Sequence, residues 1–304
     1  MASVTVRAPA KINLELAIGA PRRDGFHDVA TAYHAVSLYD EVTVTPAGRL
    51  SVTVEGSPGV PVDDVPLDAN NLAAAAVVAL AQRVGVEPAV HLHISKGIPV
   101  AGGMAGGSAD AAAALVACDA LWQTGLSRAE LLAVGAGLGS DVPFSLVGGT
   151  ALGRGRGEVL TPVLARGRFE WVVALADGGL STPDVYSECD RLRDGQVLPE
   201  PRVSDALMAA LRTGEASRLG RALHNDLQEA ACSLRPALSR TLDAGRQAGA
   251  MGSLVSGSGP TVVFLARGPE QAIDIAVALS ATETCRAVKR AHGPVPGARL
   301  IEGD

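Results

Sequence analysis

This chain has few aromatic residues, no excess of basic residues and no long apolar run. The 304 residues include four Phe, three Tyr and two Trp, and 26 Lys and Arg against 32 Asp and Glu give a net charge of −6. Without a basic stretch, nucleic acid and anionic membrane surfaces are not expected as partners. The apolar run 72–81 is too short to span a membrane, and the first residues lack the apolar core of a signal peptide.

Cysteine is rare too, and its spacing excludes a metal site of the usual kind. The four cysteines lie far apart in the chain, at Cys118, Cys189, Cys232 and Cys285. We interpret them as reduced structural residues, which is typical of a cytoplasmic protein. No His/Cys/Asp cluster suggests metal-dependent hydrolysis, and no G-x-S-x-G segment suggests acyl transfer.

What the chain does have is a glycine-rich stretch over 99–110, which reads Pro-Val-Ala-Gly-Gly-Met-Ala-Gly-Gly-Ser-Ala-Asp. Alternating apolar residues predict a strand over 89–96, and an alanine-rich run predicts a helix from about Gly107. Glycines permit positive φ, so the N–H groups of such a loop, with the positive end of the helix dipole, can hold a polyphosphate. Ser108 could reach a phosphate oxygen or its metal ion. A flexible, closely packed turn is the alternative, because no Lys follows the glycines as in the usual P-loop.

Three stretches together resemble the GHMP kinase superfamily, and they occur in the family order. They are the loop over 99–110, Ala-Pro-Ala-Lys-Ile-Asn-Leu over 8–14, and Val-Ser-Gly-Ser-Gly-Pro-Thr over 255–261. The resemblance covers nearly the whole chain. It implies an α+β, two-domain fold with the active site in the cleft between the domains. The N-terminal, ribosomal-protein-like ATP-binding domain would cover 1–167, and a ferredoxin-like C-terminal domain would cover 168–304.

The resemblance implies ATP as the phosphoryl donor, with Mg²⁺ on its β- and γ-phosphates and Ser108 as a weak candidate ligand of that metal. Two further ATP contacts are implied at Asn71 and Lys96. Asn71 could instead cap the helix that it opens, and Lys96 could be an exposed strand end. The implied ATP-binding loop consists of Pro99, Val100, Ala101, Gly102, Gly103, Met104, Ala105, Gly106, Gly107, Ser108 and Ala109.

Two residues are implied as catalytic, Lys11 and Asp141. Lys11 belongs to the Pro-x-Lys-Ile-Asn-Leu match, and Asp141 belongs to Gly-Ser-Asp-Val-Pro-Phe over 139–144, which matches the segment that carries the family's catalytic aspartate. From spacing alone, Lys11 and Asn13 could form a solvated strand face, and Asp141 could be a turn residue. The resemblance implies that Asp141 accepts the hydroxyl proton and that Lys11 stabilises the developing oxyanion. A carboxylate is a weak base for an alcohol, so positioning would matter as much as basicity.

One branch of the family fits best, the branch that phosphorylates the 2-hydroxyl of 4-diphosphocytidyl-2-C-methyl-D-erythritol in non-mevalonate isoprenoid synthesis. The segment Arg-Arg-Asp-Gly-Phe-His over 22–27 resembles the branch motif, with Phe26 where Tyr is usual. The resemblance implies that His27 recognises the cytosine. Ordinary packing is the alternative for His27, Tyr33 and Tyr186, and a solvated hairpin is the alternative for Arg156. The implied substrate contacts are Asn13, Phe26, His27, Tyr33, Arg156, Thr182, Tyr186, Gly257 and Ser258.

Three other functions stay open from the sequence. The chain could be a GHMP kinase of the homoserine or mevalonate type, but the segment 22–27 and Tyr186 argue against this. It could be a non-catalytic nucleotide-binding protein, but the presence of both Lys11 and Asp141 argues against that. An RNA-binding module is disfavoured by the acidic net charge. The expected partner is a small-molecule substrate, and the expected state is a monomer or weak homodimer.

Alternation and turn residues predict several elements around these motifs. Strands over 3–8 and 11–18, interrupted by Pro9, would join strands over 33–45 and 50–56 in an antiparallel sheet. Arg154 and Arg156 would share one face of a strand pair over 148–158. Thr182 would cap a helix whose first residue is Pro183. Residues 224–227 resemble the family's Asn-Asp-Leu helix start, with a structural role. A final strand over 285–291 would complete the ferredoxin-like half.

Overall fold

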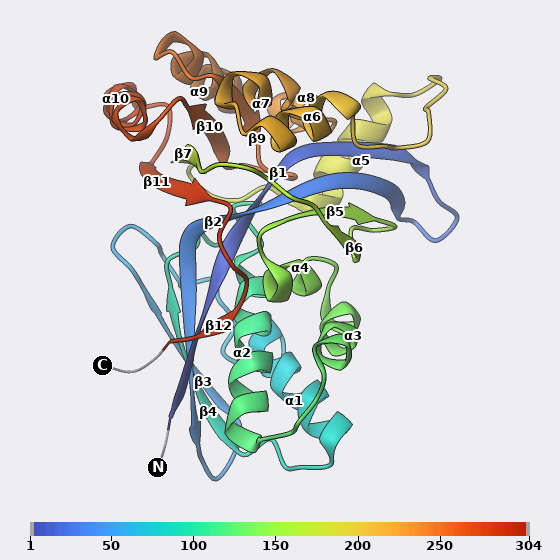
Figure 1. Ribbon diagram of the computed structural model, residues 1–304, viewed down its shortest axis with the longest axis vertical. Helices are drawn as coiled ribbons and strands as arrows, with labels where there is room; N and C mark the ends of the chain where they lie inside the picture. Colours follow the sequence, from blue (N-terminus) through green and yellow to red (C-terminus); the bar gives the residue numbers. More distant parts are fainter. Residues whose placement is uncertain (1–2, 302–304) are drawn as a thin grey trace.

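Two long strands, β1 (Val4–Pro21) and β2 (His27–Pro46), run through both halves of the molecule. The structure is a computed structural model that describes residues 3–301. The two strands pair as an antiparallel hairpin that runs from the lower half of Figure 1 up to the helices of the upper half. The expected break at Pro9 is wrong, because β1 continues through it. The register shifts between Pro9 and Ala10, and such an irregularity accommodates a residue that has no N–H to donate.

The larger sheet contains this hairpin and follows the order β12-β1-β2-β4-β3. β5 also pairs with β2 and β6, and β8 pairs with β1. The expectation of a purely antiparallel sheet is wrong at one edge, because β3 runs parallel to β4. The other strands of this sheet are β3 (Ser51–Gly56), β4 (Val90–Lys96), β5 (Thr150–Arg154), β6 (Val159–Pro162), β8 (His224–Asn225) and β12 (Arg299–Leu300).

Four helices cover the inner face of this sheet, and the first two of them are rich in alanine. The four are α1 (Leu72–Val84), α2 (Gly106–Trp122), α3 (Arg128–Leu138) and α4 (Val142–Val147), and Figure 1 shows α1 to α3 on the same side of the strands. The run 111–114 of α2 is four alanines without any exposed surface, so the helix can approach the sheet closely. Facing it, alternate residues of β1 such as Ile12 and Leu14 are fully buried. A capping box of Ser127 and Glu130 begins α3.

The smaller sheet has the order β11-β7-β10-β9, and all its pairs are antiparallel. Counted along the chain, this order is 4-1-3-2, which together with the crossover helices is the ferredoxin-like arrangement that was predicted. Its strands are β7 (Phe169–Leu175), β9 (Gly252–Val255), β10 (Val262–Ala266) and β11 (Ala287–Gly293). Its helices are α5 (Thr182–Leu192), α6 (Asp205–Thr213), α7 (Ala216–Ala222), α8 (Gln228–Leu234), α9 (Ala237–Gln247) and α10 (Pro269–Ser280).

The C-terminal half returns twice to the larger sheet. β8 pairs in parallel with β1 at Glu15 and Leu16, and β12 pairs antiparallel with β1 at Val6 and Arg7, both on the edge of β1 that does not pair with β2. A strand over 285–291 is therefore not the last one, because the chain continues past β11 to β12. The two halves are joined by strand pairing as well as by side-chain packing, and the division at 167/168 stays a prediction. Within residues 3–301 no helix is long and apolar enough to cross a membrane.

Candidate active site

A cavity of about 360 Å³ lies where the hairpin, the glycine-rich loop and the turn after β9 meet. Twelve of the predicted site residues line it: Lys11, Asn13, Tyr33, Gly103, Ala105, Ser108, Asp141, Arg156, Thr182, Tyr186, Gly257 and Ser258. The lining also includes four residues that were not predicted to belong to the site, namely Leu16, Val29, Ser140 and Leu227. Phe26, His27, Asn71, Lys96 and the other loop residues are not part of this lining. Residues from both halves of the chain therefore share one cleft.

Lys11 and Asn13 project from β1 on the side opposite Ile12, and both are buried. A solvated strand face is therefore excluded. The Lys11 ammonium donates to Asn13 Oδ1 at 2.8 Å and lies 3.7 Å from Asp141 Oδ2. Asn13 Nδ2 donates in turn to the hydroxyl of Thr31 at 2.7 Å, which fixes the amide so that its oxygen faces the lysine.

Asp141 occupies the position before α4, but its carboxylate makes no capping hydrogen bond to the described part of that helix. Asp141 therefore lies in a turn, as the alternative interpretation required, and its carboxylate remains available to the cavity. The side chain is 28% exposed and faces Lys11 across the cavity. Burial raises the pKa of the nearby Tyr33 hydroxyl well above its usual value, and the negative charge of Asp141 adds to this. Tyr33 therefore stays a neutral phenol beside the carboxylate.

The glycine-rich loop forms a concave arrangement of backbone N–H groups. Positive φ angles alternate along it, at Ala101 (52°), Gly103 (74°) and Ala105 (59°). Two of the three are alanines, so glycine does not supply every left-handed position as the sequence suggested. Gly102 instead allows close packing, because a Cβ there would lie 2.9 Å from the Thr261 hydroxyl. Alternating left-handed residues point successive N–H groups to one side, which is the geometry of an anion site.

Helix α2 begins directly after this loop, at Gly106. Its N-cap residue Ala105 offers no side-chain acceptor, so the first N–H groups of the helix remain available to an anion. Ser108 lies in the first turn and lines the cavity. The loop is held from two sides: the Met104 carbonyl accepts from the Lys11 N–H at 3.2 Å, and the Gly103 carbonyl accepts from the Ser256 hydroxyl at 3.3 Å.

A buried charge cluster supports the loop from behind. The Lys96 ammonium lies 2.5 Å from Asp40 Oδ2 and 2.6 Å from Asp110 Oδ2, and all three side chains are buried. Burial lowers the pKa of Lys96, but the two carboxylates outweigh this, so the net shift is upward. Burial and the neighbouring Asp40 raise the pKa of Asp110 well above its usual value. An exposed strand end is therefore the wrong description of Lys96, and its contact with nucleotide stays a prediction.

Asn71 caps α1, as one of its two sequence interpretations required. Its Oδ1 accepts from the N–H groups of Ala73 at 2.9 Å and Ala74 at 3.3 Å, while its Nδ2 donates to the Pro66 carbonyl at 2.8 Å. Both ends of the amide are therefore used within the protein. A contact between Asn71 and ATP stays a prediction.

Phe26 packs against Arg156, which lines the cleft. The guanidinium of Arg156 lies 4.8 Å from the centre of the Phe26 ring, which is half exposed. Arg156 belongs to the turn between β5 and β6 rather than to a strand, and it lines the active cavity. Arg154, at the end of β5, lines a different cavity. The prediction that these two arginines share one strand face is wrong, because the turn begins at Gly155.

Tyr186 and Thr182 reach the cavity from α5. The cap of α5 is Ser181 rather than Thr182, because the Ser181 hydroxyl accepts from the Asp184 N–H and Pro183 is the second helical residue. The Thr182 hydroxyl is thus left to hydrogen-bond the Ser258 hydroxyl at 2.9 Å. This contact joins α5 to the turn after β9. Burial raises the pKa of Tyr186 to about 12, so its hydroxyl remains protonated.

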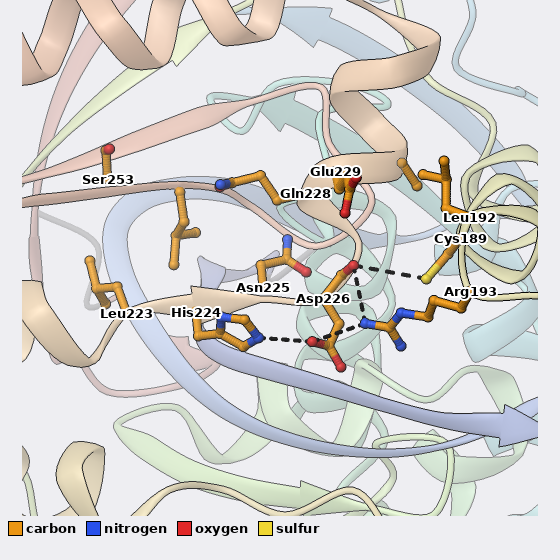
Figure 2. Close-up of a pocket in the computed structure, with 12 residues that line it drawn as sticks. Cys189, Leu192, Arg193, Leu223, His224, Asn225, Asp226, Gln228, Glu229 and Ser253 are labelled. Carbon is orange, nitrogen blue, oxygen red and sulfur yellow. Dashed lines mark hydrogen bonds and ion pairs between the residues drawn. The ribbon is translucent and has the colours of Figure 1, made fainter. Parts of the chain in front are cut away.

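The segment 224–227 holds that turn and was not singled out as part of the site. Figure 2 shows Asn225 and Asp226 side by side, with His224 and Arg193 reaching Asp226 from opposite sides. Asn225 Nδ2 donates to the carbonyls of Val255 at 2.7 Å and Gly257 at 2.8 Å. Two hydrogen bonds from one buried amide therefore fix the turn that lines the cavity next to Lys11.

Asp226 fastens the same segment to the hairpin. Its Oδ2 accepts from the Ile18 N–H at 2.7 Å, and its Oδ1 pairs with Arg193 at 3.0 Å. An Asn-Asp pair at a helix start is typical of capping, and this local signal could have indicated Asn225. The distant carbonyls that Asn225 binds have no local signal in the sequence.

Comparison with known proteins agrees with this geometry. The family model for the GHMP kinases N terminal domain matches residues 71–149, and the model for GHMP kinases C terminal matches residues 207–284. A protein of Streptomyces avermitilis named 4-diphosphocytidyl-2-C-methyl-D-erythritol kinase is 60% identical over 299 residues, which are 98% of this chain and 100% of that protein. The protein of the same name from Thermobifida fusca is 57% identical over 98% of each chain.

Solved structures give the same result for the fold. A crystal structure of 4-(cytidine 5'-diphospho)-2C-methyl-D-erythritol kinase is similar with a TM-score of 0.76 and 32% identity, over 95% of this chain and 98% of that one. A homoserine kinase from Cytophaga hutchinsonii, 19% identical over 98% and 97% of the two chains, shares the fold with a TM-score of 0.73. The resemblance read from the three motifs is confirmed: the chain belongs to the GHMP kinase family.

Proposed function

We propose that this chain transfers the γ-phosphoryl group of ATP to the 2-hydroxyl of 4-diphosphocytidyl-2-C-methyl-D-erythritol, which gives the 2-phosphate and ADP. The observation that carries the proposal is the meeting of Lys11 and Asp141 in one cleft with residues of the loop over 99–109. The names of the relatives at 52–60% identity support the choice of acceptor. Phosphoryl transfer needs mainly positioning and charge neutralisation, and this cleft offers both.

The arrangement suggests a role for each group at the acceptor hydroxyl. Asp141 accepts the proton as the oxygen–phosphorus bond forms, and Lys11 stabilises the negative charge on the oxygen. Asn13 holds the Lys11 ammonium at 2.8 Å, so the lysine is oriented before substrate arrives. Because Asp141 is partly exposed and 3.7 Å from Lys11, a hydroxyl has room to contact both groups.

The loop and the start of α2 are proposed to bind the phosphates of ATP. Mg²⁺ fits this site as an ion held mainly by the β- and γ-phosphates, where it would neutralise their charge. No group of three or more His, Cys, Asp or Glu residues that could hold a metal ion by itself occurs in the described chain, 3–301. Ser108, whose side chain lines the cavity in the first turn of α2, is the protein group that we assign to the ion or to a phosphate oxygen.

We assign Phe26, His27, Tyr33, Arg156 and Tyr186 to the cytidyl and diphosphate parts of the acceptor. The aromatic rings can stack on a base, and Arg156 can pair with a phosphate. Gly257 and Ser258 complete this side of the cavity.

The test is ADP release with Mg-ATP and four acceptors: the cytidyl compound, its uridine analogue, homoserine and mevalonate. We expect turnover with the cytidyl compound and little with the others. Turnover of homoserine or mevalonate alone would refute the acceptor but keep the kinase. Tight ATP binding without any turnover would instead favour a non-catalytic nucleotide-binding protein.

A further inference from the structure

The imidazole of His27 has a fixed partner on the other half of the molecule. Its Nε2 lies 2.9 Å from Oδ1 of Asp190, which is 163 positions further along the chain on α5. The His27 side chain is 7% exposed, and its ring centre lies 5.0 Å from the ring of Tyr186, which lines the active cavity. His27 therefore lies beside the cavity, against Tyr186, and its Nε2 is held by a carboxylate.

This contact decides which ring nitrogen carries the hydrogen. An ionised carboxylate only accepts hydrogen bonds, so Nε2 has to be the N–H of the ring. In the neutral imidazole the other nitrogen, Nδ1, then has a lone pair and is an acceptor. A carboxylate that fixes a histidine in this manner selects both its tautomer and its orientation.

We propose that Asp190 is a positioning residue for base selection, because it leaves Nδ1 of His27 as an acceptor for the exocyclic amine of a cytosine. The inference rests on the proposed function, which takes a cytidyl compound as the acceptor substrate. Uracil has a carbonyl oxygen where cytosine has the amine. With uracil, the Nδ1 lone pair and this carbonyl oxygen would be two acceptors facing each other, and both would lack a donor. The site therefore binds the uracil compound less well than the cytosine compound.

The position of Asp190 on α5 fits this role. Asp190 follows Tyr186 by one helical turn, so the two side chains lie on the same face of α5. One face of the helix thus supplies both the ring that lines the cavity and the carboxylate that holds His27. A purely structural tie between α5 and the hairpin would also explain the contact, but it would not affect the choice between two bases.

The experiment compares kcat/KM for the cytidyl compound and its uridine analogue in the wild type, Asp190→Ala and Asp184→Ala. Asp184 is an exposed carboxylate in the first turn of the same helix and serves as the matched control. We expect the cytidine-to-uridine ratio to fall at least about tenfold in Asp190→Ala, with little change in the KM for ATP, and to stay unchanged in the control. An unchanged ratio in Asp190→Ala would overturn the inference.

Two further measurements keep the test decisive if Asp190→Ala does not fold. Asp190→Asn preserves the size of the side chain and can either accept from or donate to His27, so we expect a smaller loss of the ratio in the same direction. ¹⁵N NMR of the wild type with labelled histidine should show hydrogen on Nε2 and none on Nδ1 of His27. Hydrogen on Nδ1 of the neutral ring would overturn the inference without any activity measurement.

The outcomes also separate this inference from the proposed function. If the wild type turns over the cytidyl compound while Asp190→Ala keeps the wild-type ratio, only the role of Asp190 is refuted. If the wild type does not turn over the cytidyl compound at all, the proposed function is refuted and the inference falls with it.

Discussion

The ammonium of Lys11 lies 3.7 Å from the carboxylate of Asp141, slightly too far for a direct hydrogen bond. The lysine donates instead to Asn13, at 2.8 Å. The two opposite charges therefore face each other without a direct hydrogen bond, and a substrate hydroxyl can contact both. This separation distinguishes the pair from the buried Lys96 and its carboxylates, which are in full hydrogen-bond contact.

Replacement of Asp141 by Asn tests the assignment of the proton acceptor. The amide keeps the size of the side chain but loses its charge and most of its basicity, so we expect kcat to fall at least about 100-fold. The affinity for ATP should change little, because the loop over 99–109 is untouched. ADP release and nucleotide titration measure the two quantities. A folded variant with turnover within tenfold of the wild type would show that Asp141 is not the base.

Alanine substitutions at two helical glycines that have open space around them test phosphate binding independently of stability. A Cβ at Gly107 in α2 or at Gly137 in α3 would have no neighbour within 4 Å. Gly137→Ala should raise the free energy of unfolding by about 0.5–1 kcal/mol and leave ATP binding unchanged. Gly107→Ala should not destabilise the fold, but its methyl group should weaken ATP binding at least about tenfold, since glycine here lets the phosphates approach the backbone.

Nucleotide titration and denaturant unfolding of the two variants give the answer. Equal ATP affinities for Gly107→Ala, Gly137→Ala and the wild type would show that the phosphates do not approach the first turn of α2. Destabilisation of Gly107→Ala would show that the space beside it is needed for folding instead.

Local signals in the sequence were enough for much of the fold. The strand over 90–96 and the start of α2 one residue before Gly107 followed from spacing and residue type, and the ferredoxin-like form of the smaller sheet followed from the resemblance and the alternation of strands and helices. These features depend on neighbours in the chain or on one repeated pattern. The cap of α5 was misplaced by one residue, because Ser181 and Thr182 are both good caps and only the backbone geometry separates them.

Contacts between distant segments could not be predicted in the same way. Asp190 meets His27 from 163 positions away, and Asn225 binds the Gly257 carbonyl from 32 positions away. Lys96 looked like a strand end at the edge of a loop, yet it is buried because Asp40 approaches from β2. In each case tertiary packing brings the partner close, and the sequence around either residue does not indicate which partner it will have.

Removal of Lys96 should destabilise the whole fold. Lys96→Met leaves Asp40 and Asp110 buried side by side without a counter-ion, which costs about 3–5 kcal/mol when one partner of a buried pair is lost. Arg83→Met is the control, because Arg83 pairs with Glu130 on the surface and its loss should have no measurable effect. Urea unfolding measures both variants, and equal midpoints for the two would contradict the buried cluster.

His34 should make the free energy of unfolding depend on pH. Burial lowers the pKa of this imidazole to about 3, and its Nδ1 lies 2.8 Å from the Thr150 hydroxyl. In the unfolded chain a histidine binds its proton below a pKa of about 6.5, so between these values the unfolded state holds one more proton than the folded state. Stability should therefore fall by about 1.4 kcal/mol for each pH unit on acidification through this window.

The variant His34→Gln isolates this contribution, since an amide can still reach Thr150 but does not titrate. Carboxylates make the same contribution to both proteins, so the comparison concerns only the difference in slope. Urea unfolding at pH values from 7 to 4 should give a shallower fall for His34→Gln than for the wild type. Parallel profiles would mean that His34 takes up its proton in the folded state at its ordinary pKa, and that its burial does not keep it neutral.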